Sequence, residues 1–287
     1  MSFLRVIILA IVQGLAELLP ISSSAHVVVA EKLMGLDPSS PEMTLLLVWL
    51  HTGTMLAVIV YFWKRWHRTF FQDSATLGQA AILLTLATAM TGIVGELLII
   101  AIERVWLRNA PQPEVEQLFS HLELIAPALA LAGALILLSS MRERRPSSTG
   151  DTGPGLTSRQ AVLIGLVQGL CLPFRGFSRS GATISTGMLA GVDKARAEEF
   201  SFALAVILTP PVVLRETLRL IRAQQVNQGS LASTMVSSVL GGFCAFLAGL
   251  LALKWLSQWL EGGRWYLFGI YCLLAAGAVA TLHYIGY

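Results

Sequence analysis

The sequence predicts an all-α fold, a polytopic membrane helix bundle built from two inverted-topology repeats. Hydrophobic residues make up 55% of the chain and charged residues only 13%, whereas about a quarter of a soluble domain is charged. Several apolar runs approach the ~20 residues that a membrane-spanning helix requires. A Val-Gln-Gly-Leu pattern followed by proline occurs twice, at Val12–Pro20 and Val167–Pro173. Such paired interruptions are typical of a site between internal repeats.

We expect one integral membrane domain, 1–287, whose repeats cover about 1–145 and about 159–287. Each repeat has one re-entrant helix pair followed by three transmembrane helices. The linker between them, about 146–158, is rich in Pro, Gly, Ser and Thr, which favour turns and loops.

The first repeat begins with a helix over Phe3–Leu19 that breaks at Pro20 and resumes over Ser22–Met34. Neither piece is long enough to span a bilayer comfortably, so the two are expected to form a re-entrant pair. Three apolar runs predict the spans that follow, at about Met43–Trp63, Leu77–Ile102 and Leu118–Met141.

The second repeat follows the same plan, with a short helix over Arg159–Leu172, a break at Pro173 and a second piece over Ser180–Val192. Its spans are expected at about Phe200–Leu220, Ser233–Leu256 and Tyr266–Tyr284. Because three spans separate the two re-entrant pairs, the pairs should enter the membrane from opposite faces.

The distribution of Lys and Arg over the expected loops places both termini outside. No cleavable signal peptide is expected, because the first apolar run leads straight into a polar motif. The net charge of +3 is too small to indicate a nucleic-acid partner. The three cysteines, Cys171, Cys244 and Cys272, lack paired spacing and are interpreted as core residues rather than disulfides or a zinc site.

Gln13 and Glu17 are four residues apart and therefore share one helix face. A carboxylate within a membrane indicates a functional site by default, although a structural glutamate bonded inside the bundle would explain it too. A carboxylate and an amide oxygen on one face could hold a hard cation such as Mg²⁺.

Ser22, Ser23 and Ser24 directly follow Pro20, where a new helix should begin. Serine is a good N-cap, but three in succession exceed what one cap requires. His26 is close enough in sequence to act on one of these hydroxyls, and a hydroxyl beside a base is the usual arrangement for nucleophilic attack.

Arg179 lies between Ser178 and Ser180 at an expected helix start. A guanidinium fits phosphate oxygens in two places, and helix N-termini attract anions. The sequence therefore favours a phosphate site here, with a structural Arg179–Glu17 ion pair as the alternative. Thr183 should face the same site one turn later, and Arg175 is either a second phosphate contact or an interfacial side chain.

Other ionisable residues carry less information. Glu96, His51, Arg215 and Glu216 fall within expected spans, where they could serve the structure or line the cavity. Glu198 and Glu199 are interpreted as a solvated helix start that follows a turn at Asp193 and Lys194.

At these motifs the chain resembles the bacterial undecaprenyl-diphosphatase family, the bacitracin-resistance type of integral membrane phosphatase. Gln13–His26 is similar to the family's first signature and Gly176–Thr183 to its second, and Glu199–Phe202 also matches. There are two departures: Gln13 stands where many members have a second glutamate, and Arg175 replaces the usual proline.

The resemblance implies hydrolysis of undecaprenyl diphosphate to undecaprenyl phosphate and inorganic phosphate. This reaction recycles the lipid carrier of cell-wall synthesis and confers bacitracin resistance. The implied location is the bacterial cytoplasmic (inner) membrane, with a site open to the periplasm. A divalent cation, Mg²⁺ or Ca²⁺, is the implied cofactor.

The resemblance also implies roles for individual residues. Ser23 would be the nucleophile and His26 its base, with Glu17 and Arg179 as the other catalytic residues. The residues expected to bind the diphosphate are Gln13, Ser22, Ser178, Ser180, Thr183 and Arg175, and those expected to hold the metal are Glu17 and Gln13.

The alternative function is a transporter or flippase of a polyprenyl phosphate lipid, because inverted repeats with broken helices are common in transporters. The serine, histidine and arginine together favour an enzyme, since transport needs no nucleophile. A scaffold protein would leave the intramembrane charges unexplained. The expected partners are a polyprenyl diphosphate lipid and the bilayer, no nucleic acid is expected, and a homodimer is left open.

Overall fold

A computed structural model describes residues 2–36, 40–106, 108, 118, 121–142, 156–224 and 231–286. Within these ranges every regular element is helical, so the predicted all-α class is confirmed there. The greater part of the predicted linker, 146–155, lies outside the described residues.

Five helices are long and apolar enough to cross a membrane: Met43–Phe70, Ser74–Trp106, Leu122–Met141, Met235–Leu260 and Tyr266–Tyr284. Each contains one of the predicted spans or most of it. The sixth predicted span, Phe200–Leu220, is helical as well and lies within α8 (Lys194–Gln224). The protein is thus a multi-pass membrane protein.

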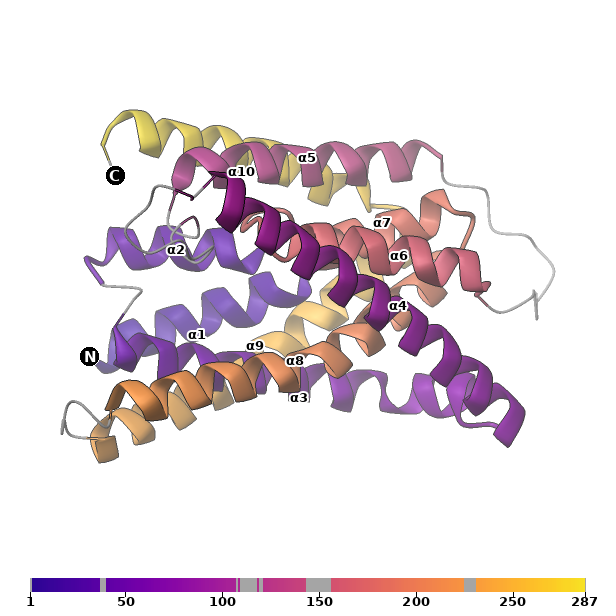
Figure 1. Cartoon of the computed structure of the whole chain (residues 1–287), viewed down its shortest axis with the longest axis horizontal. Helices are drawn as coiled ribbons and strands as arrows, with labels where there is room; N and C mark the ends of the chain where they lie inside the picture. Colours follow the sequence, from indigo (N-terminus) through magenta and orange to yellow (C-terminus); the bar gives the residue numbers. More distant parts are fainter. Residues whose placement is uncertain are drawn as a thin grey trace. The chain divides into compact units, whose positions relative to one another are not determined.

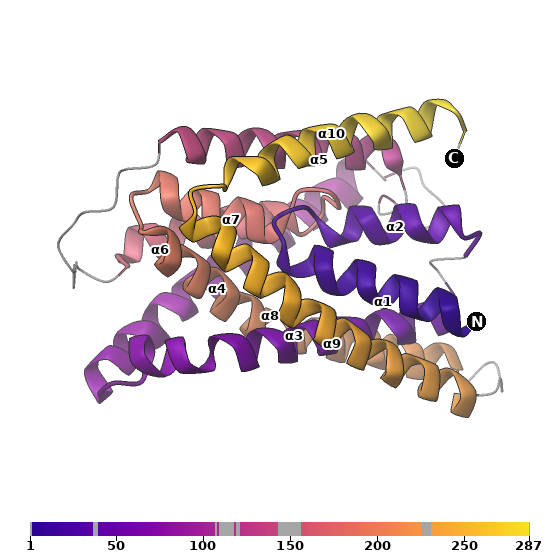
Figure 2. The same cartoon turned by 180° about the vertical axis from the view of Figure 1, so that it is seen from behind.

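Both predicted helix breaks are present. The first separates α1 (Phe3–Leu18) from α2 (Ser23–Leu33), and the second separates α6 (Ser158–Cys171) from α7 (Arg179–Leu189). Figure 2 shows α1 and α2 lying side by side as a hairpin. Each break coincides with a proline, which cannot donate the next helical hydrogen bond.

The chain divides into two compact units. The first unit contains α1, α2, most of α3 (Pro41–Phe70), the later part of α8 and most of α9 (Leu231–Glu261). Its core is a cluster that includes Val6, Leu9, Leu46, Leu50 and Ala245. Small residues allow α1 and α9 to approach each other closely. A Cβ added to Gly14 would lie only 2.6 Å from the Ala248 Cβ.

The second unit contains α4 (Ser74–Ala101), the π-helix η1 (Ile102–Trp106), α5 (Leu122–Met141), α6, α7, the start of α8 and α10 (Tyr266–Tyr284). Figure 1 shows α5 and α10 side by side. α4 packs on α6 through Gly165, whose added Cβ would meet the Ala87 backbone. Thr91 Oγ1 also donates to the Gly165 carbonyl at 3.0 Å.

A buried network fixes α7 within this unit. The indole of Trp265, which is 0% exposed, donates to Ser139 Oγ at 2.9 Å. Ser139 on α5 donates in turn to Ser185 Oγ on α7 at 3.0 Å. Because these contacts link three helices, they hold the second half of α7 at a defined place in the unit.

The interpretation of Glu198 and Glu199 as a solvated helix start is wrong. The Glu198 side chain is 1% exposed and its Oε2 lies 3.3 Å from Arg65 Nη1. Glu199 accepts a hydrogen bond from Thr69 Oγ1 at 3.1 Å, and its carbonyl accepts from Trp66 Nε1 at 3.2 Å. The end of α3 covers these carboxylates, which is a tertiary contact that a local charge pattern cannot reveal.

Candidate active site

The first candidate group lies in the first unit and centres on the carboxylate of Glu17. Gln13 Nε2 donates to Glu17 Oε2 at 3.1 Å, as the shared helix face predicts. Ser23 Oγ donates to the same oxygen at 2.5 Å. The helix break after α1 therefore folds the first residue of α2 back onto α1 and places a hydroxyl against a carboxylate.

His51 on α3 completes this group. Its Nδ1–H donates to the Leu47 carbonyl at 2.8 Å, since a carbonyl can only accept. Its Nε2 lies 3.9 Å from Glu17 Oε2. The sequence marked His51 only as one of several ionisable residues within spans, and the contact depends on the packing of α3 against α1, which no spacing in the sequence reveals.

The other predicted residues of the first hairpin lie in or just after its turn. Ser22 is 5% exposed and has a φ of 67°, a left-handed conformation that is uncommon outside glycine. His26 lies one turn into α2 and is half-buried. Its role as a base stays a prediction.

The second candidate group lies in the second unit at the start of α7. Ser178 is the N-cap, and its Oγ accepts from the Gly181 amide at 3.2 Å. Arg179 is the first helical residue and is half-buried, and Ser180 is 5% exposed. A guanidinium at a helix N-terminus repels the positive end of the helix dipole unless an anion lies between them.

Thr183, one turn further along α7, is 0% exposed. Its Oγ1 donates to the Arg179 carbonyl at 2.8 Å and lies 2.6 Å from Ser201 Oγ on α8. The hydroxyl therefore ties α7 to α8. Ser201 belongs to the Glu199–Phe202 match in the sequence, but no role was assigned to it there.

The turn before α7 is tightly packed. Gly176 has a φ of +103°, and an added Cβ would meet the Ile125 carbonyl at 2.6 Å. Arg175, beside it, is half-buried. The turn at Pro20–Ser22 is grouped with this unit: the Pro20 carbonyl accepts from Cys272 Sγ at 3.4 Å and would lie 3.2 Å from a Cβ added to Gly181.

A metal would have to be held by few protein ligands. The described residues contain no group of three or more His, Cys, Asp or Glu side chains suited to a metal ion. The oxygens of Glu17 and Gln13 are nevertheless hard donors, and Mg²⁺ is often bound by one or two carboxylates together with substrate phosphates and water. The donor set fits a cation that the substrate helps to bind.

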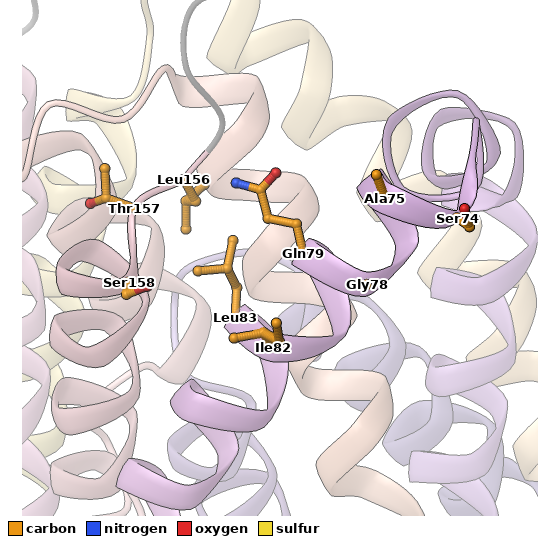
Figure 3. A pocket seen from close by; sticks show the side chains of 9 residues that line it. All are labelled: Ser74, Ala75, Gly78, Gln79, Ile82, Leu83, Leu156, Thr157 and Ser158. Atoms are coloured by element: carbon orange, nitrogen blue, oxygen red, sulfur yellow. The ribbon is translucent and has the colours of Figure 1, made fainter.

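A pocket of about 650 Å³ lies elsewhere, between the first turns of α4 and α6. In Figure 3, Gln79 and Leu83 of α4 lie across this pocket from Leu156 and Thr157. Its lining contains no residue of either candidate group, so the pocket does not mark the predicted chemistry.

The chain matches the model of the bacitracin resistance protein BacA family over residues 6–278. The chain belongs to this family. It is 57% identical to Undecaprenyl-diphosphatase 2 of Acinetobacter baylyi, with 98% of both chains covered. It is 34% identical to Undecaprenyl-diphosphatase 1 of Burkholderia pseudomallei, over 96% of this chain and 95% of the relative.

A third relative, Undecaprenyl-diphosphatase of Desulfosudis oleivorans, is 34% identical over 94% of this chain and 95% of its own. The family resemblance that the two motifs indicated is thus confirmed, and it extends over nearly the whole chain. The individual roles of the motif residues, and the predicted proximity of Glu17 to Arg179, stay predictions.

Proposed function

We propose that this multi-pass membrane protein hydrolyses undecaprenyl diphosphate to undecaprenyl phosphate and inorganic phosphate. The observation that carries this function is the 57% identity, over 98% of both chains, to a protein named Undecaprenyl-diphosphatase 2. The reaction recycles a lipid carrier of cell-wall synthesis, and the family's name indicates bacitracin resistance as the phenotype.

Ser23 is the nucleophile in this proposal. Its Oγ forms a bond to the terminal phosphorus while the bond from phosphorus to the bridging oxygen breaks. Undecaprenyl phosphate leaves with that oxygen and its electron pair. The proton of Ser23 passes to Glu17 Oε2, which already accepts its hydrogen bond. Water then attacks the phosphorus of the phosphoserine while the bond from phosphorus to Ser23 Oγ breaks, Glu17 returns its proton to Oγ, and inorganic phosphate is released.

His26 is the alternative base that the sequence predicts for the same proton. Glu17→Gln removes the carboxylate base but keeps an acceptor for Ser23, whereas His26→Ala removes only the imidazole. If Glu17 takes the proton, Glu17→Gln should lower kcat by about 10²–10⁴, while His26→Ala retains phosphoenzyme formation.

The start of α7 binds the phosphoryl group in this proposal. Arg179 supplies a forked cation, and the helix N-terminus supplies oriented dipoles. Ser178 and Ser180 add hydroxyls at the same end of α7, and Arg175 lies in the preceding turn. These groups stabilise negative charge as it develops on the transferring phosphoryl group.

Mg²⁺ or Ca²⁺, when bound by Glu17 and Gln13, would neutralise diphosphate oxygens there. This assignment is supported by the oxygen donors of the first group and by the charge of the substrate. Removal of divalent cations with EDTA is expected to abolish phosphate release, and addition of Mg²⁺ or Ca²⁺ in excess to restore it.

The function is tested with purified protein in detergent and undecaprenyl diphosphate, by measuring released phosphate. Ser23→Ala, Glu17→Ala and Arg179→Ala should each abolish turnover in a folded protein. Thr52→Val is the matched control, since Thr52 Oγ1 donates to the Val48 carbonyl of its own helix at 2.8 Å. An active Ser23→Ala protein, or a radiolabel trapped on another residue, would exclude the serine nucleophile.

We also infer a finer architecture. The two hairpins are proposed to be re-entrant pairs of inverted repeats that act on one headgroup, in the inner membrane and with access from the periplasm. The repeated Val-Gln-Gly-Leu motif and the two breaks support this arrangement. We also propose that the protein forms a homodimer. Light scattering in detergent would measure its mass. Lipid movement across vesicles without phosphate release would favour a flippase instead.

A further inference from the structure

Gln168 on α6 is a buried amide whose polar atoms have no partner among the described residues. The side chain is 0% exposed, and neither its Nε2 nor its Oε1 makes a hydrogen bond. A buried amide without partners costs free energy. Such a group within a well-packed helix pair calls for a physical explanation.

The first hairpin contains the same motif in a satisfied form. Gln13 is also buried, but its Nε2 donates to Glu17, which lies four residues later on the same face. The residue four positions after Gln168 is Leu172, which cannot accept a hydrogen bond. The two motifs therefore differ four residues after the glutamine. Gln13 has a hydrogen-bond partner there, whereas Gln168 does not.

Helix register places Gln168 level with the start of α7. α6 and α7 are consecutive helices joined by a short turn, so they run antiparallel. Ile164 Cδ1 lies 3.5 Å from the place of a Cβ on Gly187. Gln168 is one turn further along α6, and Thr183 is one turn back along α7. The amide is thus on the α7 side and one turn from Arg179.

The other side of α6 is already occupied. Gly165 and Gly169 pack against α4, where an added Cβ on Gly169 would meet the Thr91 carbonyl at 2.9 Å. Thr91 is itself satisfied, since its Oγ1 donates to the Ala87 carbonyl at 2.8 Å. On α6 itself, the amide of Gln168 is the buried side-chain polar group without a partner among the described residues, and it lies on the α7 side.

We propose that Gln168 is a further substrate-binding residue, whose Nε2 donates to a phosphate oxygen of the prenyl diphosphate headgroup. The inference rests on the proposed function. A phosphate oxygen fits better than a cation, because Arg179 and the N-terminus of α7 attract anions and repel cations. Binding then supplies the acceptor that Glu17 supplies to Gln13 in the first hairpin.

The test is Gln168→Leu, which keeps a similar volume and removes both polar atoms. Affinity is measured with farnesyl methylenediphosphonate, a hydrolysis-resistant prenyl diphosphonate, and KM with undecaprenyl diphosphate. Loss of a hydrogen bond to a charged ligand should weaken binding and raise KM by about tenfold or more. The unliganded protein should be equally or more heat-stable, because an orphaned amide has been removed.

Thr91→Val is the matched control on the same helix pair. It removes a hydroxyl that has protein partners, so it should lower heat stability and leave the affinity for the diphosphonate unchanged. If Gln168 has a purely structural role, Gln168→Leu will behave like this control, and the inference is overturned.

The outcomes also separate this inference from the function on which it rests. A wild-type protein that neither binds the diphosphonate nor releases phosphate would overturn both. A wild-type protein that does both, with unchanged affinity in Gln168→Leu, would overturn the role of Gln168 alone. Gln168→Glu provides a second check, since a carboxylate there should weaken binding further than leucine does by repelling the headgroup.

Discussion

Arg65 Nη1 lies 3.3 Å from Glu198 Oε2, and the side chain of Glu198 is only 1% exposed whereas that of Arg65 is 34% exposed. The pair joins the end of α3 to the start of α8 across 133 residues of sequence. A carboxylate withdrawn from water needs such a partner, because its desolvation is otherwise uncompensated.

Arg65→Met should therefore destabilise the protein, because it removes the positive charge that lies 3.3 Å from the buried carboxylate of Glu198. The expected loss is about 3–5 kcal/mol, as for other broken buried pairs. Thermal unfolding in detergent measures it. Arg68→Met is the control, since Arg68 lies on the exposed face of the same helix and its loss should have little effect. Adding Glu198→Gln to Arg65→Met should recover part of the lost stability, and failure to do so would contradict the ion-pair explanation.

Glu199, the next residue, gives a pH prediction. Burial is the largest influence on its carboxyl group and raises its pKa above the ordinary value, partly opposed by the hydrogen bond from Thr69 and the charge of Arg65. Because the pKa of Glu199 is higher in the folded protein than in the unfolded chain, the folded state is least stable at pH values at which Glu199 is ionised. Stability from this group should rise as pH falls through the folded-state pKa and level off below the unfolded one.

Glu199→Gln removes this dependence while keeping an acceptor for Thr69. The variant should melt at a higher temperature than the wild type at pH 8, and the difference should vanish as pH approaches 4. Melting curves across that range in one detergent test the prediction. A difference of the opposite sign at pH 8 would show that the Arg65 and Arg196 charges outweigh burial.

Much of the fold was predictable because hydrophobic runs and prolines act locally. The span Tyr266–Tyr284 lies where its apolar run predicts it. The two helix breaks lie at Pro20 and Pro173, as expected. α3 extends beyond its predicted end at Trp63, because its basic last turns are covered by Glu198 and Glu199.

Apart from one contact within a helix, the candidate site was predictable only as a list of residues. Spacing correctly placed Gln13 on the same face as Glu17, since that relationship is internal to one helix. The contacts of Glu17 with Ser23 and His51 depend on a turn and on a third helix. Among the described residues Gln168 has no hydrogen-bond partner, which is a property of packing, although its position in a repeated motif was a signal.

Gly176 should resist replacement by any residue with a side chain. Its φ is +103°, and a Cβ would meet the Ile125 carbonyl at 2.6 Å. Gly191 also has a positive φ, +87°, but no heavy atom of the described residues lies within 4 Å of its Cβ position. Gly191→Ala should cost about 1–2 kcal/mol of backbone strain, and Gly176→Ala clearly more. Unfolding and phosphate release measure both, and equal losses would argue against the clash with α5.

The bond between Thr183 and Ser201 allows the role of Thr183 to be decided. If its hydroxyl holds α7 against α8, Thr183→Val and Ser201→Ala should each lower stability by about 1 kcal/mol. The double variant should lose less than their sum, because both remove the same bond. If the hydroxyl instead binds phosphate, as the sequence resemblance implies, Thr183→Val should weaken binding of the headgroup far more than Ser201→Ala does. Thr186→Val is the control, since Thr186 Oγ1 donates to the Ala182 carbonyl of its own helix at 2.7 Å. Because the Thr183 hydroxyl already bonds to two protein oxygens, we expect the first outcome.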